Sequence, residues 1–248
     1  DAAALAAAQA LFPVAADNCD GDVTNIVKTS GAFVAGGSCS QAGSYTNTWE
    51  VTDECGNTSA VYTQTITVED TQSPTWTTTA GDLDRTVECS DAAALAAAQA
   101  LFPVAADNCD GDVTNIVKTS GAFVAGSCVS AGSYTNTWEV TDECGNTSDI
   151  FTQVITITDL TNPTISCIPD PTRDAVPGEC FYTVTGNEFD PTGVNDNCGI
   201  ASIINDYNGL STLDGERIAE GTSIVWRIED HCGNIDTCSF TLTVNQYP

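Results

Sequence analysis

The sequence predicts an all-β protein built from tandem antiparallel β-sandwiches, and three observations lead to this prediction. The segment from Asp1 to Gly36 recurs without change from Asp91 to Gly126, which sets a repeat period of about 90 residues. Thr, Val, Ile, Tyr and Trp alternate with polar residues between Gly, Asn and Asp, as they do in strands joined by tight turns. A third, diverged repeat is marked by Asp196–Cys198 and His231–Asn234.

The repeats predict a domain division at residues 1–72, 73–161 and 162–248, each of the usual size for a small domain with its own core. The second copy of the shared segment is preceded by Asp82–Ser90, so we expect the first domain to lack its opening strand. The linkers, 68–76 and 157–165, are short, which predicts that neighbouring domains sit end to end.

Each of the first two domains is expected to contain a short Ala-rich helix that ends at Pro13 or Pro103, with Ser90 as N-cap in the second copy. Further along, residues 44–53 alternate, with Trp49 on the face turned to the core. Its counterparts Trp138 and Trp226 are expected to fill cores as well. Six or seven short strands per repeat favour the connectivity of immunoglobulin-like domains.

Composition restricts the setting and the partners. The chain has 34 acidic and 6 basic residues and a net charge of -28, which disfavours nucleic acid and anionic lipid and favours cations. Its 12 cysteines and single histidine indicate an oxidising compartment, so we expect an extracellular protein. Its apolar runs are shorter than a membrane span requires, so this segment is not expected to insert into a membrane.

The motifs of the third domain follow a characteristic order: PTISC (163–167), PGEC (177–180), DNCG (196–199), EDHCGN (229–234) and TCSFTLTV (237–244). The first two domains keep DNC, WEVTDECGN and the strand after it, but carry the Ala-rich helix in place of PGEC. The chain thereby resembles the hyalin-repeat-like (HYR-type), immunoglobulin-like modules of large cell-surface adhesin and stalk proteins of Bacteroidetes-type bacteria. The resemblance implies the fold and leaves the function open, because such modules serve both as spacers and as adhesive units.

In a sandwich of this topology, the DNC loop and the CGN turn lie at the same end of the domain. This predicts three disulfides, Cys19–Cys55, Cys109–Cys144 and Cys198–Cys232. Repeated zinc sites are disfavoured, because the chain has no CxxC pair and one histidine.

The remaining cysteines are assigned by comparing the repeats. Cys89 and Cys128 lie at the opposite end and are predicted to pair. The pair Cys167–Cys238 is predicted because both occur only in the third domain. Cys39, the counterpart of Cys128, would bond a cysteine before Asp1, and Cys180 is either free or links chains.

Acidic residues gather where the domains are expected to meet, in the DNC loops, beside the CGN turns and in the linkers. Converging carboxylates with loop carbonyls suit Ca²⁺, which takes six to eight oxygen ligands. The alternative is that Asp and Asn serve only as turn residues. The candidate calcium ligands are Asp17, Asp20, Asp22, Asp53, Asp70, Asp107, Asp110, Asp112, Asp142, Asp159, Asp196 and Asp230.

The pattern does not indicate an enzyme, because His231 is the one imidazole and no repeated nucleophile accompanies it. The main hypothesis is a structural repeat segment of a long extracellular stalk, filament or adhesin that supports attachment or gliding. Its partners would be neighbouring modules of the same chain and, in a fibre, other copies. The alternative is a set of multivalent modules that bind surface glycans.

Overall fold

The computed structural model describes residues 2–19, 21, 23–111 and 113–246. They form two compact units, each made of several segments, and the second sequence repeat contributes to both. The first unit comprises Asp1–Thr79, Pro103–Thr119 and Thr137–Phe151, and the second comprises Ala80–Phe102, Ser120–Asn136 and Thr152–Pro248. We use first, second and third repeat for residues 1–72, 73–161 and 162–248, a division that stays a sequence prediction.

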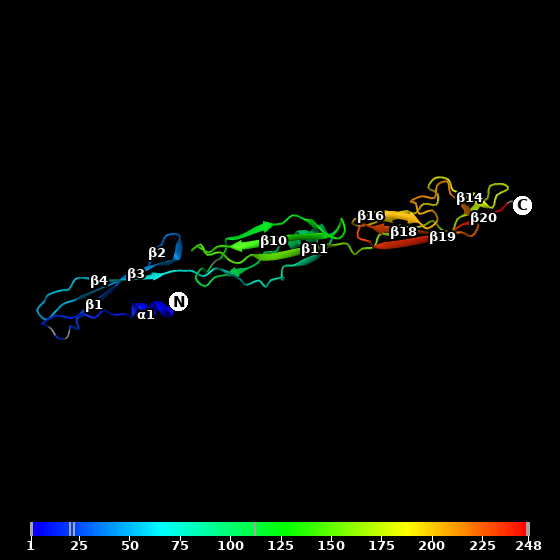
Figure 1. Ribbon diagram of the computed structural model, residues 1–248. Coiled ribbons are helices and arrows are strands. Elements are labelled where there is room, and N and C mark those ends of the chain that lie inside the picture. The colour runs from blue at the N-terminus through cyan, green and yellow to red at the C-terminus, as the bar shows by residue number, and fades with distance from the viewer. Residues whose placement is uncertain (1, 20, 22, 112, 247–248) are drawn as a thin grey trace. The chain divides into compact units, whose positions relative to one another are not determined.

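The first repeat contains helix α1 (Ala2–Gln9) and one antiparallel sheet, shown in blue and cyan in Figure 1. In the sheet, the long strand β3 (Cys39–Val51) pairs with β1 (Ile26–Ser30), β2 (Val34–Gly36) and β4 (Tyr62–Val68). Trp49 of β3 is 2% exposed. The prediction that the repeated tryptophans fill cores is confirmed, since Trp138 and Trp226 are buried as well.

The second repeat has counterparts of these strands and three further strands, two in its opening segment and one after its helix. Four strands lie in the order β6-β11-β10-β8, with β9 paired to β10, and β5 pairs separately with β7. Strand β6 runs parallel to β11, although the sequence predicts antiparallel pairing throughout. The elements are β5 (Thr75–Trp76), β6 (Arg85–Glu88), α2 (Ala92–Gln99), β7 (Ala105–Ala106), β8 (Ile116–Ser120), β9 (Val124–Ala125), β10 (Gly132–Val140) and β11 (Phe151–Thr158).

Among its described residues, the third repeat contains strands and no helix. It has the largest core, which centres on Trp226, Phe189 and Leu242. Its main sheet has the order β16-β18-β19, and three strand pairs, β12-β15, β13-β20 and β14-β17, complete it. The strands are β12 (Thr164–Ser166), β13 (Thr172–Asp174), β14 (Phe181–Thr183), β15 (Thr192–Asn195), β16 (Ile200–Asn205), β17 (Arg217–Ala219), β18 (Ser223–Asp230), β19 (Ile235–Thr241) and β20 (Thr243–Asn245).

Together the strands confirm the predicted all-β class, with two short helices, in tandem immunoglobulin-like sandwiches. Among the described residues, neither helix has the length and apolar character needed to cross a membrane.

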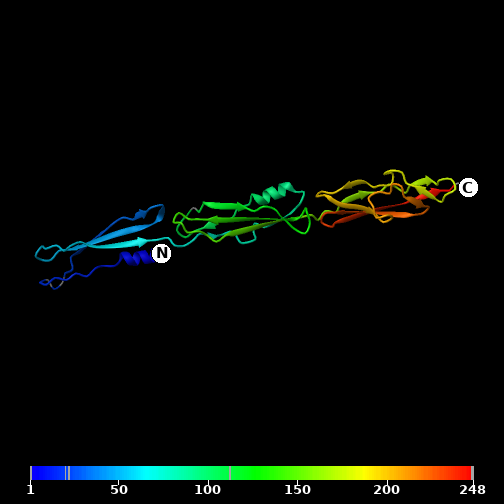
Figure 2. The same ribbon diagram turned by 45° about the horizontal axis from the view of Figure 1, so that its top comes forward.

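Helix α2 is held by a cap and by packing on the sheet. The side chain of Asp91, rather than the predicted Ser90, caps it by accepting a hydrogen bond from the Ala94 N–H at 2.8 Å. Ala98 packs with Val87 of β6 and with Ile155 and Ile157 of β11. Figure 2 shows this helix in green, and α1 in blue. Because an eight-residue helix is marginal alone, burial against β6 and β11 is what stabilises it.

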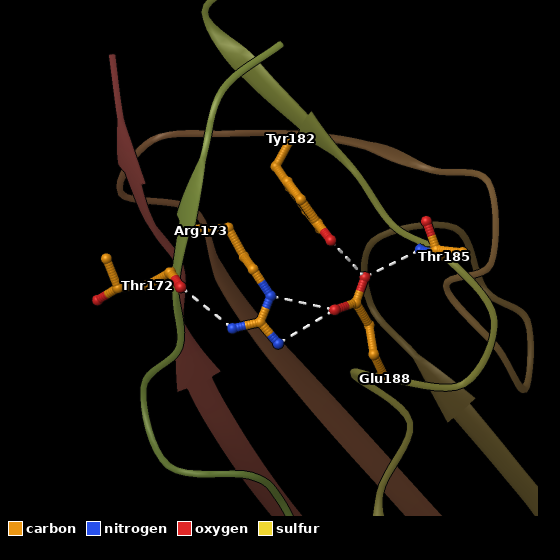
Figure 3. Close-up of polar contacts among 5 residues, drawn as sticks. All are labelled: Thr172, Arg173, Tyr182, Thr185 and Glu188. Carbon is orange, nitrogen blue, oxygen red and sulfur yellow. Dashed lines mark hydrogen bonds and ion pairs between the residues drawn. The ribbon is translucent and has the colours of Figure 1, made fainter. Parts of the chain in front are cut away.

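In the third repeat, an ion pair joins Arg173 of strand β13 to Glu188. Strand β13 pairs in parallel with β20 as β6 does with β11, and it places Arg173 opposite Val244. The Arg173 guanidinium lies 3.1 Å from Glu188 Oε2 and 5.2 Å from the Phe189 ring centroid. Glu188 Oε1 accepts hydrogen bonds from the Tyr182 hydroxyl and the Thr185 N–H, at 2.8 and 2.9 Å (Figure 3).

The replacement Glu188→Gln is expected to destabilise the third repeat by about 1–2 kcal/mol at pH 7, because it weakens several hydrogen bonds to a charged group. Burial disfavours the Glu188 carboxylate, but the hydrogen bonds from Thr185, Tyr182 and Arg173 outweigh it and lower its pKa. A lowered pKa gives stability that is present above the ordinary value of 4.5 and is lost as the pH falls. The two proteins should therefore differ less in urea midpoint at pH 3 than at pH 7.

The matched control is Glu179→Gln, which alters the more exposed Arg217–Glu179 pair. It should change the urea midpoint little at either pH. An equal loss for Glu188→Gln at pH 7 and at pH 3 would contradict the role of the Glu188 charge.

Candidate metal centre at the repeat boundaries

Three of the four disulfides join one repeat to the next. Cys39 bonds Cys144, Cys89 bonds Cys198 and Cys128 bonds Cys232, with Cα–Cα distances of 4.6, 6.1 and 5.0 Å. These distances lie within the usual range for disulfides. The bonded residues are 104 to 109 positions apart, which is more than one repeat period. The bridges therefore link consecutive repeats covalently.

Four predicted pairings are consequently wrong: Cys19–Cys55, Cys109–Cys144, Cys198–Cys232 and Cys89–Cys128. The expectation that Cys39 bonds a cysteine before Asp1 is wrong too. The predicted topology places the cysteines at the two ends of a domain. The predicted pairs, however, joined cysteines of the same domain. At a boundary, the end of one repeat meets the start of the next, so the nearest sulfur belongs to the neighbour.

The fifth predicted pair, Cys167–Cys238, is present, with a Cα–Cα distance of 5.5 Å. It lies within the third repeat, where Cys238 is the register partner of Trp226. The corresponding partner of Trp138 in the second repeat is Phe151, which packs against Trp76 with ring centroids 5.5 Å apart. Trp76 thus has a core role. In the third repeat, the position of Trp76 is taken by Ile165, which is 8% exposed, and Cys167 follows two residues later.

Beside the bridges at the start of the third repeat, three carboxylates converge. Asp159 comes from the linker, Asp196 from the DNC loop and Asp230 from the position before the HCGN turn, and one oxygen of each lies within 4.8 Å of the others. Asp159 and Asp230 are 5% and 2% exposed. Both carboxylate oxygens of Asp159 and the Oδ1 atom of Asp196 are buried without a hydrogen-bond partner of normal geometry. Three carboxylate oxygens are therefore buried close together in one acidic group.

The surrounding hydrogen bonds fix the other oxygens. Asn234 donates through Nδ2 to Asp230 Oδ2 at 2.7 Å and to the backbone oxygen of Asp159 at 3.1 Å. Asp230 Oδ1 accepts from the backbone N–H groups of Cys232 and Asn234. Asp196 Oδ2 accepts from the N–H groups of Cys198 and Gly199. The turns thus hold the carboxylates in place.

The start of the second repeat has the same arrangement. Asn146 donates to Asp142 Oδ2 at 2.8 Å and to the backbone oxygen of Asp70 at 3.2 Å. Asp70 and Asp107 lie within 4.8 Å of each other and of the Cys109 sulfur, and the Oδ2 atom of each carboxylate is buried without a partner. The recurrence of the arrangement at two boundaries shows that it belongs to the repeat.

The structure brings some of the predicted calcium ligands to these groups and leaves others apart from them. Five of them are brought to these groups directly, namely Asp70, Asp107, Asp159, Asp196 and Asp230, and Asn146 connects Asp142 to Asp70. Asp17 is exposed and Asp53 is partly exposed, and both accept hydrogen bonds within their own turns. Asp110 donates its N–H to Asp107 and contributes no carboxylate to a group among the described residues. Asp20, Asp22 and Asp112 lie outside the described residues.

The negative charges of the group repel one another. Burial is the main reason why the pKa of Asp159 is raised, followed by the charges of Asp230 and Asp196. For Asp230 and Asp142, burial acts in the same upward direction, but hydrogen bonds from Asn234 and Asn146 outweigh it and lower the pKa of both. Burial and the neighbouring acids Asp70 and Asp107 raise the pKa of the Cys109 thiol. A bound cation would relieve the repulsion that these groups experience.

The donors present fit a hard divalent cation such as Ca²⁺, which prefers carboxylate oxygens. Asp159, Asp196 and Asp230 would hold it at the start of the third repeat, and Asp70 and Asp107 at the start of the second. Buried, unpaired carboxylate oxygens cost free energy unless they bind a partner.

Sequence reasoning missed Glu88, which sits beside this group and next to Cys89. Its Oε1 atom accepts from Asn197 Nδ2 at 3.1 Å and from the Thr161 hydroxyl at 3.3 Å. Glu88 is at the far end of β6, and only the contact between repeats brings it to the DNC loop. The one available signal was the sequence ECS, which places an acid next to a bridging cysteine.

Residues 77–157 match the family model described as HYR-like domain with 4 cysteines. The protein "Hyalin" of Strongylocentrotus purpuratus is 30% identical over 210 residues, which cover 82% of this chain and 16% of that protein. The chain thus spans about a sixth of the length of this relative. HYR-like and hyalin-type domains are non-enzymatic adhesion modules. This agrees with the prediction that the chain is not an enzyme.

Among solved structures, mouse Cadherin-23 EC22-24 is similar with a TM-score of 0.33 and 11% identity, over 93% of this chain and 89% of that one. Drosophila N-cadherin EC1-4 gives a TM-score of 0.29 and 10% identity, over 82% and 58%. The family match and the hyalin relative together show that residues 77–157 are similar to HYR-like domains and that the chain is similar to hyalin.

Proposed function

We propose that this chain is a structural segment of a long extracellular adhesion protein, in which consecutive repeats are locked together so that the segment resists extension. The observation that carries the proposal is the connectivity of the disulfides. The loops closed by Cys39–Cys144, Cys89–Cys198 and Cys128–Cys232 overlap in sequence, so each boundary lies inside at least one covalent ring. A chain of independent modules would need none of these bridges.

Calcium is the proposed second lock at the same boundaries. The carboxylates that meet there come from two repeats, since Asp159 ends one repeat and Asp196 and Asp230 belong to the next. An ion held by all three would resist separation of the repeats as well as relieve their repulsion. The chemistry of the carboxylate donors and their burial support a calcium ion at this place.

Pulling single molecules from their two ends tests the proposal. With the disulfides intact, the fully unfolded chain should reach an extension several-fold shorter than after reduction, because overlapping rings prevent most residues between Cys39 and Cys232 from contributing length. Disulfides closed within each repeat would leave the linkers free to extend, and the extension would be longer by about 30 residues of chain, or roughly 100 Å. That longer value would refute the locked segment.

The setting proposed for the segment is a cell-surface stalk, filament or adhesin that supports attachment or gliding. The motif resemblance to Bacteroidetes-type surface proteins supports a bacterial source, and the hyalin relative supports an extracellular one. Multivalent glycan binding is the alternative function, and a fibre of several chains is the alternative assembly. A glycan array would separate the two functions, because a purely structural segment gives no saturable binding.

A further inference from the structure

The opening segment of the second repeat, residues 73–90, fills two places in that repeat. Trp76 of β5 packs against Phe151, and its indole N–H donates to the backbone oxygen of Asp149 at 2.7 Å. Farther along, β6 pairs in parallel with β11 and places Val87 beneath α2. In this repeat Phe151 is 4% exposed, and Ile155 and Ala98 are buried.

The first repeat has counterparts of the residues that contact this segment in the second repeat. Two open grooves lie at the corresponding places. One groove, of about 350 Å³, is lined by Pro13, Val14, Trp49 and Tyr62, the last of which is the counterpart of Phe151 and is 59% exposed. The other, of about 330 Å³, lies between α1 and β4 and is lined by Leu5, Ala8, Ile66 and Val68. Helix α1 has the sequence of α2 but contains no buried residue.

The edge of β4 completes this surface. Among the described residues, β4 pairs on one side only, with β3, whereas β11 pairs with both β10 and β6. An unpaired edge offers backbone N–H and C=O groups to an incoming strand. Apolar grooves on both sides of such an edge fit a strand with one large aromatic residue and, farther along, one aliphatic residue facing the sheet.

A thiol lies where the incoming strand would end. In the second repeat, β6 is followed by Cys89, which bonds Cys198 of the third repeat. The counterpart of Cys198 one period earlier is Cys109, which is an exposed free thiol. Asn108 corresponds to Asn197, which donates to Glu88 at 3.1 Å beside the bridge. The first boundary thus has the receiving half of a bridge of the Cys89–Cys198 type.

We propose that the first repeat is an acceptor for an opening segment of the same kind as residues 73–90, supplied by a further repeat of this type, and that Cys109 captures the cysteine of that segment. The Trp of the segment enters the groove at Trp49 and Tyr62. Its R-T-V-E strand adds in parallel to β4 beneath α1. Its cysteine then meets Cys109 as Cys89 meets Cys198.

A synthetic peptide with the sequence of residues 73–90 tests this on the intact chain. Its cysteine is supplied as a mixed disulfide with glutathione, so that the Cys109 thiolate attacks the peptide sulfur, a new disulfide forms and glutathione leaves as the thiolate. The docked strand raises the local concentration of its sulfur near Cys109, and we expect capture there roughly 100-fold faster than at the exposed thiol of Cys180. Peptide mapping by mass spectrometry identifies the modified cysteine.

Peptide variants make the outcome specific without altering the fold of the acceptor. The V87D peptide puts a charge in the groove under α1, and the W76A peptide leaves the other groove empty, so each should remove most of the rate advantage of Cys109. Capture at Cys109 should also raise the melting temperature of the first repeat. Equal rates at Cys109 and Cys180, or the same rate for the native and V87D peptides, would overturn the proposal.

Discussion

Replacing Cys128 and Cys232 together by serine is expected to lower the free energy of unfolding of the linked second and third repeats by about 4 kcal/mol. The bond joins residues 104 positions apart, and closing a loop of about 100 residues stabilises a folded chain by roughly 4.7 kcal/mol in the chain-entropy model. The neighbouring Cys89–Cys198 bridge already restricts part of the same loop, so the effect falls somewhat below that value. Guanidinium unfolding followed by tryptophan fluorescence measures the loss.

The control is Cys180→Ser, which removes an exposed free thiol and should leave the unfolding midpoint unchanged. The connectivity is checked independently by mapping disulfide-linked peptides of the unreduced protein. A peptide that joins Cys198 to Cys232 would show that the bridges close within repeats. In that case the paired substitution would break two bonds and leave Cys89 and Cys198 without their partners.

The sequence was informative about the interior of each repeat and much less so about the boundaries. Trp49, Trp138 and Trp226 could be placed in cores because alternation along a strand determines which face a side chain takes. The pair Cys167–Cys238 could be found because its two members are absent together from the other repeats. Both inferences need only local geometry or internal comparison.

The bridges between repeats could not be found in this way, because repeated sequence gives two equivalent cysteines for every partner. Cys144 and Cys55 have the same neighbours in sequence, yet Cys144 bonds Cys39 and Cys55 is free. The predicted topology paired the cysteines that lie at one end of the same repeat, whereas the structure pairs cysteines of adjacent repeats. The acidic group was predicted in part for the same reason: linker and loop acids were visible in sequence, but Glu88 reaches the boundary only through β6.

Asp159→Asn is expected to change the stability of the chain in opposite directions with and without Ca²⁺. Without divalent cations, the raised pKa of Asp159 means that its stabilising contribution is present below the ordinary value of 3.8 and is lost as the pH rises. At pH 7 the ionised, buried Asp159 is therefore destabilising, and asparagine should raise the melting temperature. With Ca²⁺ at 100 times its Kd, the natural protein gains about 2.7 kcal/mol, and the variant loses most of that gain.

A change of stability in opposite directions with and without Ca²⁺ distinguishes a cation site from a cluster of turn residues. The control Asp149→Asn changes an exposed carboxylate on the other side of the CGN turn, and its melting temperature should follow that of the natural protein in both conditions. A gain of about 2.7 kcal/mol corresponds to a rise of roughly 10 °C or more for a domain of this size, well within reach of calorimetry. If Ca²⁺ raises the melting temperatures of natural protein and Asp159→Asn equally, the ion binds elsewhere. If it raises neither, the buried oxygens of Asp159 and Asp196 are satisfied by water, and the disulfides alone hold the boundary.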